Sequence, residues 1–249
     1  ETYTSYCEPF IGGGAVLFAL QPQKAIINDI NSELIGVYRA IKDDVEALIK
    51  RLAEFENTKE CFYDVRSWDR NAELYNQLTD IDKAARVIFL NKTCYNGLYR
   101  VNSAGEFNTP FGRYKNPNIV NENTLRAVNE YFNMADVTIL NTSYSEAVQG
   151  LPENSFVYLD PPYDPISVTA SFTGYNAGGF SRADQIALRD CCRQLDAAGI
   201  KFMLSNSATE FIQDIYSEFN ITIVPAKRAI NSIGSKRGCV DEVIVRNYE

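Results

Sequence analysis

A buried strand and the turn that ends it are recognisable in one stretch, Ser155-Phe156-Val157-Tyr158-Leu159-Asp160-Pro161-Pro162-Tyr163. The apolar residues 155–159 predict a strand, which the prolines end because proline cannot donate to a strand ladder. Asp160 and Tyr163 then lie at the carboxyl end of a strand, where open α/β sheets bind ligands. A carboxylate, a free carbonyl and an aromatic face suit a planar amino group stacked on Tyr163. Taken alone, the motif could equally be a rigid turn.

A glycine-rich turn lies near the start of the chain. Residues 6–10 predict a strand, glycines 12–14 a turn and residues 15–20 a helix. Glycines let a ligand approach the backbone, and the following helix N-terminus offers amide groups. The turn departs from the dinucleotide pattern G-x-G-x-x-G, because Phe18 stands where a third glycine would be sought.

Asp29 strengthens the prediction of a ligand at this turn. It ends the next strand, 15 residues after Gly14, where an acidic side chain can accept hydrogen bonds from ribose hydroxyls. The turn and Asp29 together predict a cofactor that contains a nucleoside. The alternative for Asp29 is a charge that only stabilises the start of the next helix.

The rest of the pattern alternates strands and helices, which predicts an α/β fold with a parallel sheet. Asn31 or Ser32 can cap one helix and Ser181 another. Late strands 221–224 and 242–245 could form a hairpin. The other predicted elements are strands at 25–27, 137–140 and 201–204, helices at 33–41, 181–195 and 208–217, and a Gly/Ser/Thr-rich loop at 164–180.

An insertion interrupts this alternation. Residues 44–92 have helical periodicity, whereas residues 93–120 are rich in Asn, Gly, Tyr and Arg, which predicts an ordered, functional loop region. Residues 92–118 carry four basic side chains against one acidic, a local +3, and residues 225–239 carry four basic side chains and no acid, a local +4. Such islands on an acidic body are compatible with a phosphate-binding face, although they are also common on solvated surfaces.

Composition narrows the classes of protein further. The 249 residues carry a net charge of −8, contain no histidine and are 45% hydrophobic, as in ordinary globular domains. The absence of histidine argues against a zinc site and against a histidine base, so we expect no metal. The six cysteines form no C-x-x-C pair, which favours reduced thiols in the cytoplasm. No apolar run approaches the length of a membrane span.

Several motifs, in this order, resemble the Dam-type (DpnII modification methylase-like) DNA N6-adenine methyltransferases that recognise GATC. The resemblance covers essentially the whole chain. Its markers are Glu8-Pro9-Phe10-Ile11-Gly12-Gly13-Gly14, Asn28-Asp29-Ile30-Asn31, Tyr95-Asn96-Gly97-Leu98-Tyr99-Arg100, Phe111-Gly112-Arg113-Tyr114, Asp160-Pro161-Pro162-Tyr163, Gly179-Phe180-Ser181 and Val243-Ile244-Val245-Arg246-Asn247-Tyr248.

The resemblance implies a Rossmann-like methyltransferase sheet with helices on both faces and an inserted, mainly helical and loop, target-recognition domain. The catalytic domain would comprise residues 1–55 and 134–249, and the DNA-binding domain residues 56–133. The enzyme would be cytoplasmic, encoded by a bacterium or phage, and would act in restriction-modification or in replication and repair. Its partner would be GATC-containing duplex DNA, and its cofactor S-adenosylmethionine.

The resemblance also implies roles for individual residues. The cofactor-binding residues would be Glu8, Phe10, Gly12, Gly14, Asp29, Tyr144 and Asp160. The catalytic residues would be Asp160, Pro161, Pro162 and Tyr163, with the Asp160 carboxylate and the Pro161 carbonyl accepting from the adenine amino group of a flipped base. The DNA-binding residues would be Tyr95, Asn96, Leu98, Arg100, Asn102, Pro110, Arg113, Tyr114 and Lys115.

Two departures from the family pattern concern the cofactor. The family opens with a Lys-Trp-Ala/Thr-Gly-Gly-Lys-like segment, whereas this sequence starts downstream of it. After residues 137–140 the family often has an acid followed by an aromatic, and here Ser143-Tyr144 keeps only the aromatic. A catalytically impaired DNA-binding module is therefore one alternative. The others are an NAD-type oxidoreductase, and a methyltransferase of RNA or of amide groups.

Overall fold

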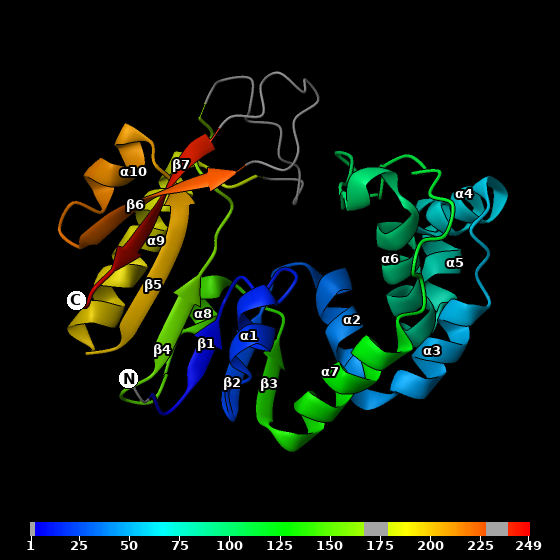
Figure 1. Ribbon diagram of the computed structural model, residues 1–249, viewed down its shortest axis with the longest axis horizontal. Coiled ribbons are helices and arrows are strands. Elements are labelled where there is room, and N and C mark those ends of the chain that lie inside the picture. The colour runs from blue at the N-terminus through cyan, green and yellow to red at the C-terminus, as the bar shows by residue number, and fades with distance from the viewer. Residues whose placement is uncertain (1–2, 167–178, 228–238) are drawn as a thin grey trace. The chain divides into compact units, whose positions relative to one another are not determined.

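The computed structural model describes residues 3–166, 179–227 and 239–249. Its centre is a seven-stranded sheet in the order β3-β2-β1-β4-β5-β7-β6 (Figure 1). The strands are β1 Tyr6–Glu8, β2 Lys24–Asn28, β3 Asp136–Leu140, β4 Phe156–Leu159, β5 Lys201–Ser207, β6 Asn220–Lys227 and β7 Cys239–Arg246. The predicted mixed α/β fold with a sheet flanked by helices is confirmed.

The strand order reverses direction at β1, which pairs in parallel with β2 on one side and with β4 on the other. β5 continues the parallel sheet beside β4, with Leu159 opposite Leu204. β7 then runs antiparallel to both β5 and β6, which confirms the predicted late hairpin. The reversal at β1 is a topological switch point, the place at which such sheets bind ligands.

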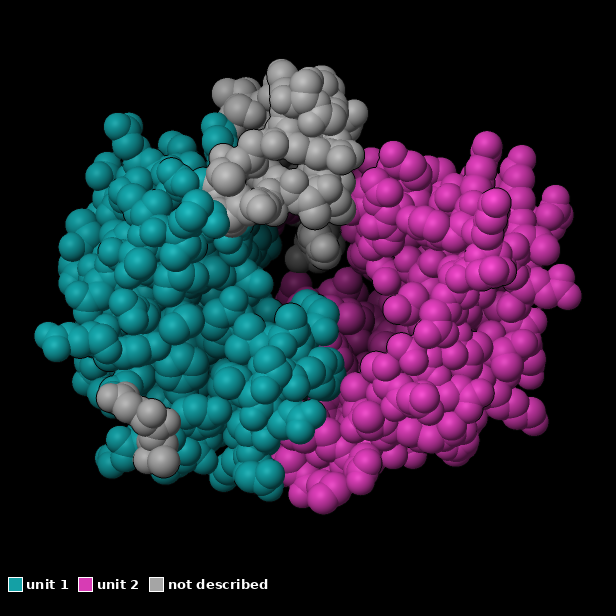
Figure 2. All heavy atoms as spheres, viewed as in Figure 1, with its two compact units in different colours: residues 1–28, 142–173, 180–249 teal, residues 29–141, 174–179 magenta. Residues whose placement is uncertain are grey.

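The chain forms two compact units, coloured separately in Figure 2. Unit 1 comprises residues 1–28, 142–173 and 180–249, and unit 2 comprises residues 29–141 and 174–179. The helices of unit 1 are α1 Ala15–Leu20, α8 Tyr144–Ala147, α9 Arg182–Ala197 and α10 Glu210–Ile215. Those of unit 2 are α2 Ser32–Asp43, α3 Val45–Ala53, α4 Lys59–Ser67, α5 Ala72–Gln77, α6 Asp80–Thr93 and α7 Glu122–Met134, with 3₁₀ turns at Trp68–Arg70 and Tyr95–Gly97.

Local capping explains where the longer helices start. The Asn31 side chain accepts from the backbone N–H groups of Glu33 and Leu34 and so caps α2. Ser181 caps α9 in a reciprocal capping box with Asp184. Both predicted caps are confirmed, with Asn31 rather than Ser32 at the start of α2. Most of the loop expected at 164–180, and Arg228, Lys236 and Arg237 of the second basic island, lie outside the described residues.

Each unit has its own apolar core. In unit 1, Leu188, Cys192 and Leu195 of α9 pack with the buried residues of β4, β5 and β7. In unit 2, a cluster that includes Leu48 and Phe89 joins α2, α3, α4 and α6. Cys7, Cys61, Cys94, Cys191 and Cys192 are free thiols, and no group of three or more potential metal ligands occurs within the described ranges. None of the described helices is both long and apolar enough to cross a membrane.

Candidate active site and nucleic-acid interface

The carboxyl ends of β1 and β4 bring together the two motifs of unit 1. These strands are parallel neighbours, with Cys7 opposite Val157, so the segments that follow them leave the sheet at the same edge. Phe10 and the glycine turn follow β1, and Asp160 follows β4. The predicted convergence of these two strand ends is what a ligand site at the switch point requires.

The glycine turn has a conformation that only glycine adopts easily. Gly12 and Gly14 have φ angles of +47° and +69°, in the left-handed region that side chains disfavour. A Cβ atom built on Gly12 or Gly13 would meet nothing within 4 Å among the described residues. The backbone of the turn therefore faces open space that a ligand could enter.

Asn28, at the end of β2, holds this turn and a second loop in place. Its carbonyl accepts from Ile11 N at 2.9 Å, and its Nδ2 donates to the Pro9 carbonyl at 3.0 Å. The same side chain exchanges hydrogen bonds with the backbone of Thr142, at 3.0 and 2.9 Å. Asn28 is only 1% exposed, so these bonds are shielded from water and fix both loops relative to β2.

An aromatic pair lies beside the turn. The rings of Phe10 and Tyr144 stack with their centroids 5.2 Å apart, and Phe180 meets the Phe10 ring edge-on at 6.1 Å. Burial raises the pKa of the Tyr144 hydroxyl to about 12, so this phenol is neutral at pH 7. Ser143, the position at which the resemblance led us to expect an acid, caps α8 in a reciprocal box with Glu146. Its role in this structure is therefore to begin the helix that carries Tyr144.

Glu8 is a buried carboxyl group at the end of β1. It is 2% exposed, and the Tyr6 hydroxyl donates to its Oε2 at 2.6 Å. The pKa of Glu8 is raised to about 7, chiefly by desolvation and also by the nearby charge of Asp160, against hydrogen bonds that lower it. Because the side chain has almost no accessible surface, its influence on a ligand is electrostatic and structural.

In the segment after β4, the acidic residue Asp160 is exposed, and hydrogen bonds hold the segment in place. The Asp160 side chain lies at the surface, whereas Pro161 is buried and Tyr163 is half-buried. The Ser205 hydroxyl donates to Asp160 Oδ1 at 2.6 Å, and Gln185 Nε2 donates to the Pro162 carbonyl at 2.8 Å. The carboxylate is thus available to a ligand in a fixed orientation.

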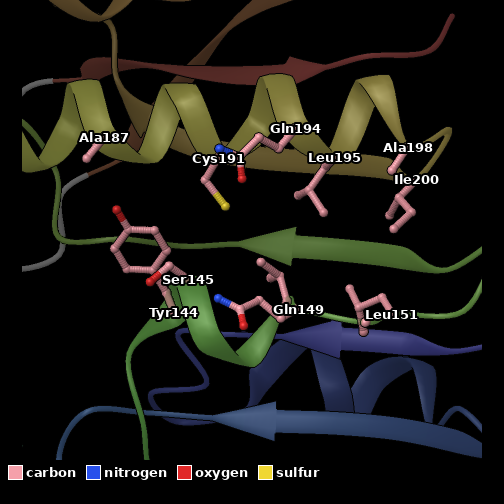
Figure 3. A pocket seen from close by; sticks show the side chains of 12 residues that line it. Tyr144, Ser145, Gln149, Leu151, Ala187, Cys191, Gln194, Leu195, Ala198 and Ile200 are labelled. Atoms are coloured by element: carbon pink, nitrogen blue, oxygen red, sulfur yellow. The ribbon is translucent and has the colours of Figure 1, made fainter.

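A pocket of about 540 Å³ lies between α8 and α9. Figure 3 shows Cys191 and Leu195 pointing from α9 toward α8, with Tyr144 at one end and Leu151 at the other. Burial raises the pKa of the Cys191 thiol to about 11, so it is protonated at pH 7. Among the described residues that line this pocket, Tyr144 is the one predicted site residue. The predicted catalytic motif lies elsewhere in unit 1.

Asp29 belongs to unit 2 and directly follows β2. It is half-buried, and its Oδ1 accepts from Asn31 N at 2.9 Å. Its carbonyl accepts from the Asn141 side chain at 2.8 Å. One carboxylate oxygen therefore helps to shape the start of α2, in agreement with the structural alternative, while a carboxylate can accept further bonds.

The segment predicted to bind DNA forms a β-hairpin in unit 2. Val101 and Phe107 form an antiparallel bridge, and Asn108 N donates to the Arg100 carbonyl at 2.9 Å. Asn102 shapes the turn, because its Oδ1 accepts from the N–H groups of Ala104 and Glu106, both at 3.0 Å. Its amide also donates to the Glu106 carboxylate, so the Asn102 side chain is used within the hairpin.

The other predicted DNA-binding residues share exposure at the surface of unit 2. Tyr95, Leu98 and Tyr114 are 54%, 39% and 41% exposed. Asn96 and Arg113 have left-handed backbones, and the Tyr114 hydroxyl accepts from Asn96 N at 3.0 Å. The remaining exposed members of the predicted set are Arg100, Pro110 and Lys115.

A buried ionic network, not anticipated from the sequence, supports this hairpin. Arg86 on α6 is 0% exposed and pairs with Asp69 at 2.5 Å and with Glu33 at 3.4 Å. The same Asp69 Oδ2 accepts from Phe107 N at 2.7 Å, and Tyr99 donates to Glu33 at 2.8 Å. The hairpin is therefore held to the helices of unit 2 through charged hydrogen bonds in a poorly solvated place.

Comparison with known proteins identifies the family of the chain. The profile of the D12 class N6 adenine-specific DNA methyltransferases matches residues 1–230. The type II methyltransferase M1.LlaDCHI of Lactococcus lactis subsp. cremoris is 46% identical over 250 residues, 100% of this chain and 88% of the relative. M.MjaIII of Methanocaldococcus jannaschii is 45% identical, covering 98% and 88% of the two chains.

A DNA adenine methylase of Vibrio cholerae is 33% identical over 243 residues, which cover 95% of this chain and 84% of the relative. The matched lengths cover nearly the whole chain and therefore both compact units. These similarities exclude the alternatives of an oxidoreductase and of a methyltransferase of RNA or amide groups. The chain belongs to the D12 class of N6 adenine-specific DNA methyltransferases.

Proposed function

We propose that this protein transfers a methyl group from S-adenosylmethionine to N6 of a flipped adenine in duplex DNA, with GATC as its target. The observation that carries the proposal is the exposed Asp160 carboxylate, fixed at the end of β4 beside the strand that leads to the glycine turn. GATC is inferred from the resemblance in the recognition segment. Since bacterial DNA is cytoplasmic, we expect the enzyme to act in that compartment.

The residues after β1 fit S-adenosylmethionine. The open space beside Gly12 allows close approach to the backbone, and the stacked Phe10–Tyr144 pair offers an apolar wall for an adenine ring. Asp29 is proposed to accept from the ribose hydroxyls. When bound, the cofactor supplies an electrophilic methyl group on a positively charged sulfur. Glu8 is proposed to act from beneath this site without direct contact.

The target base has to leave the helix, at a cost of a few kcal/mol, before its amino group can reach this site. We propose that Tyr163 stacks on the flipped base while Asp160 and the Pro161 carbonyl accept the two N6 hydrogens. Pro162 fixes the path between these groups. The N6 nitrogen is a weak nucleophile, because its lone pair is delocalised into the ring. Two acceptors would favour a pyramidal nitrogen whose lone pair points at the methyl group.

The reaction is then a single displacement. With the cofactor bound, the N6–carbon bond would form as the carbon–sulfur bond breaks, the electron pair would stay on sulfur, and N6 would then release a proton to solvent. Positioning and electrostatics supply the acceleration. No histidine or cysteine nucleophile is needed, in agreement with a chain without histidine.

DNA recognition is proposed to reside in residues 56–133, within unit 2. The exposed residues around the hairpin offer the required chemistry: Arg100 can read guanine through two hydrogen bonds, and Leu98 and Pro110 can contact bases. Tyr95 and Asn96 would act at the base step and phosphates, and Arg113, Tyr114 and Lys115 would support backbone contacts. Asn102 would contribute by shaping the hairpin, since its side chain is bonded within it.

The test is methyl transfer from labelled S-adenosylmethionine to duplexes that contain either GATC or a scrambled site. We expect label on the GATC duplex alone, and loss of transfer in Asp160→Ala with duplex binding largely retained. Equal loss of transfer and binding in Asp160→Ala would contradict the role given to Asp160. Transfer to a different sequence would leave the chemistry intact and refute GATC.

A further inference from the structure

Ser205 is a buried hydroxyl that contacts the proposed catalytic acid. It lies on β5, one residue after Leu204, which pairs with Leu159 of the parallel strand β4. This register places Ser205 beside Asp160, and its Oγ lies 2.6 Å from Asp160 Oδ1. Ser205 is 3% exposed, whereas Asp160 is exposed. The Leu159 carbonyl lies 3.5 Å from the same Oγ.

A serine hydroxyl has a single hydrogen to donate. The bond to a carboxylate is shorter and about twice as strong as one to a neutral carbonyl, so the hydrogen belongs to Asp160 Oδ1. The bond fixes the rotation of the carboxylate and leaves Oδ2 free of this contact. Because water has little access to Ser205, the bond is also protected from solvent competition.

The same hydroxyl contributes to the electrostatic environment of Tyr163, the aromatic part of the motif. Burial raises the pKa of Tyr163, and a hydrogen bond with the Ser205 side chain partly lowers it. Tyr158, on β4, shows the same two influences in the same order. The Ser205 hydroxyl therefore lies near both the acid and the ring proposed to stack on the base.

Neighbouring side chains hold the backbone of the motif. Asn206 Oδ1 accepts from Asp164 N at 3.0 Å, and its Nδ2 donates to Gln185 Oε1 at 3.1 Å. Gln185 in turn donates to the Pro162 carbonyl, and both amide side chains are 0% exposed. With the backbone fixed in this way, the remaining freedom of Asp160 is the rotation of its side chain, which Ser205 restrains.

We propose that Ser205 is a positioning residue for methyl transfer. Its hydroxyl holds Asp160 Oδ1 so that Oδ2 accepts the N6–H of the target adenine. This inference rests on the proposed role of Asp160. Ser205 contacts neither DNA nor cofactor in the proposed arrangement, so its loss should slow the chemical step and leave ground-state binding unchanged.

The experiment compares Ser205→Ala with Ser5→Ala in the full chain. Ser5 is also buried, at 1% exposure, and its hydroxyl has no hydrogen-bond partner among the described residues, so it controls for the same change of volume. We expect Ser205→Ala to lower the single-turnover rate by about 10- to 100-fold. The dissociation constants for DNA and cofactor should match those of Ser5→Ala. Ser205→Cys, which keeps a weak donor, should give an intermediate rate.

Flipping of the base supplies a readout that does not depend on transfer. A duplex with 2-aminopurine at the target should show the same fluorescence increase with Ser205→Ala as with the unchanged chain. A rate for Ser205→Ala equal to that of Ser5→Ala, or a parallel loss of rate and DNA affinity, would overturn the inference. If Asp160→Ala keeps full transfer, the proposed role of Asp160 is wrong. If Asp160→Ala loses transfer but Ser205→Ala does not, only the inference about Ser205 is wrong.

Discussion

Replacing Arg86 by methionine should destabilise the protein strongly. The guanidinium is 0% exposed, pairs with Asp69 and Glu33, and donates to the carbonyls of Val65 and Arg66 at 3.1 and 3.2 Å. Methionine fills a similar volume but leaves the Asp69 carboxylate, whose side chain is 11% exposed, without its cation. Removing one partner of a buried ion pair costs about 3–5 kcal/mol, which is a large part of the stability of most domains.

Urea denaturation followed by circular dichroism would measure this loss. Arg126→Met is the matched control, because Arg126 pairs with Glu46 and Glu122 on an open surface and is 45% exposed; such pairs contribute little. Hydrogen exchange of the Phe107 amide is a local measurement, because this N–H donates to Asp69. The exchange should be faster in Arg86→Met. A loss of stability no larger than in the control would refute the reasoning.

Three further predictions concern unit 1. Because the pKa of Glu8 is raised from 4.5 to about 7, the folded state binds the extra proton, so its stability falls as pH rises between these values. The free energy of unfolding of Glu8→Gln relative to the unchanged chain, measured by urea titration, should therefore rise by up to about 3 kcal/mol as pH increases across that window. A difference that does not change with pH would contradict this prediction. Asn28→Ala removes three side-chain hydrogen bonds, one buried and two partly buried, and should cost about 2–3 kcal/mol, seen as a lower melting temperature. An unchanged melting temperature would contradict the role of Asn28 in holding the two loops. Tyr144→Ala should weaken cofactor binding about 3- to 10-fold through the lost ring contact while DNA affinity stays constant, as calorimetry would show; equal cofactor affinity would remove Tyr144 from the site.

Local signals in the sequence were sufficient for much of the fold. The apolar run before Asp160, the glycines before α1 and the caps at Asn31 and Ser181 each act over a few residues, so their outcomes could be predicted. The turn at Asn102 was also readable in principle. Asn followed by glycine three residues later is typical of a tight turn, and that pattern was interpreted only as DNA contact.

Contacts that join distant segments could not be predicted in this way. Ser205 reaches Asp160 only because β4 and β5 pair in one register, which a single sequence does not reveal. Arg86 sits within an apolar helical pattern, and its partners lie 17 and 53 residues earlier in the chain. A serine or asparagine ending a predicted strand, as in Ser205-Asn206, is the one available signal for this part of the site.

The position of β7 in the sheet has a consequence for synthesis of the protein. β7 lies between β5 and β6 and pairs with both, although it comes after both in the chain. A nascent chain that has emerged only as far as Lys227 still lacks the strand that joins its neighbours. β5 then has an unpaired edge, the kind of exposed ladder that invites association with other chains. The sheet therefore stays incomplete until β7 has been synthesised, and until then the edge of β5 is open to association with other chains.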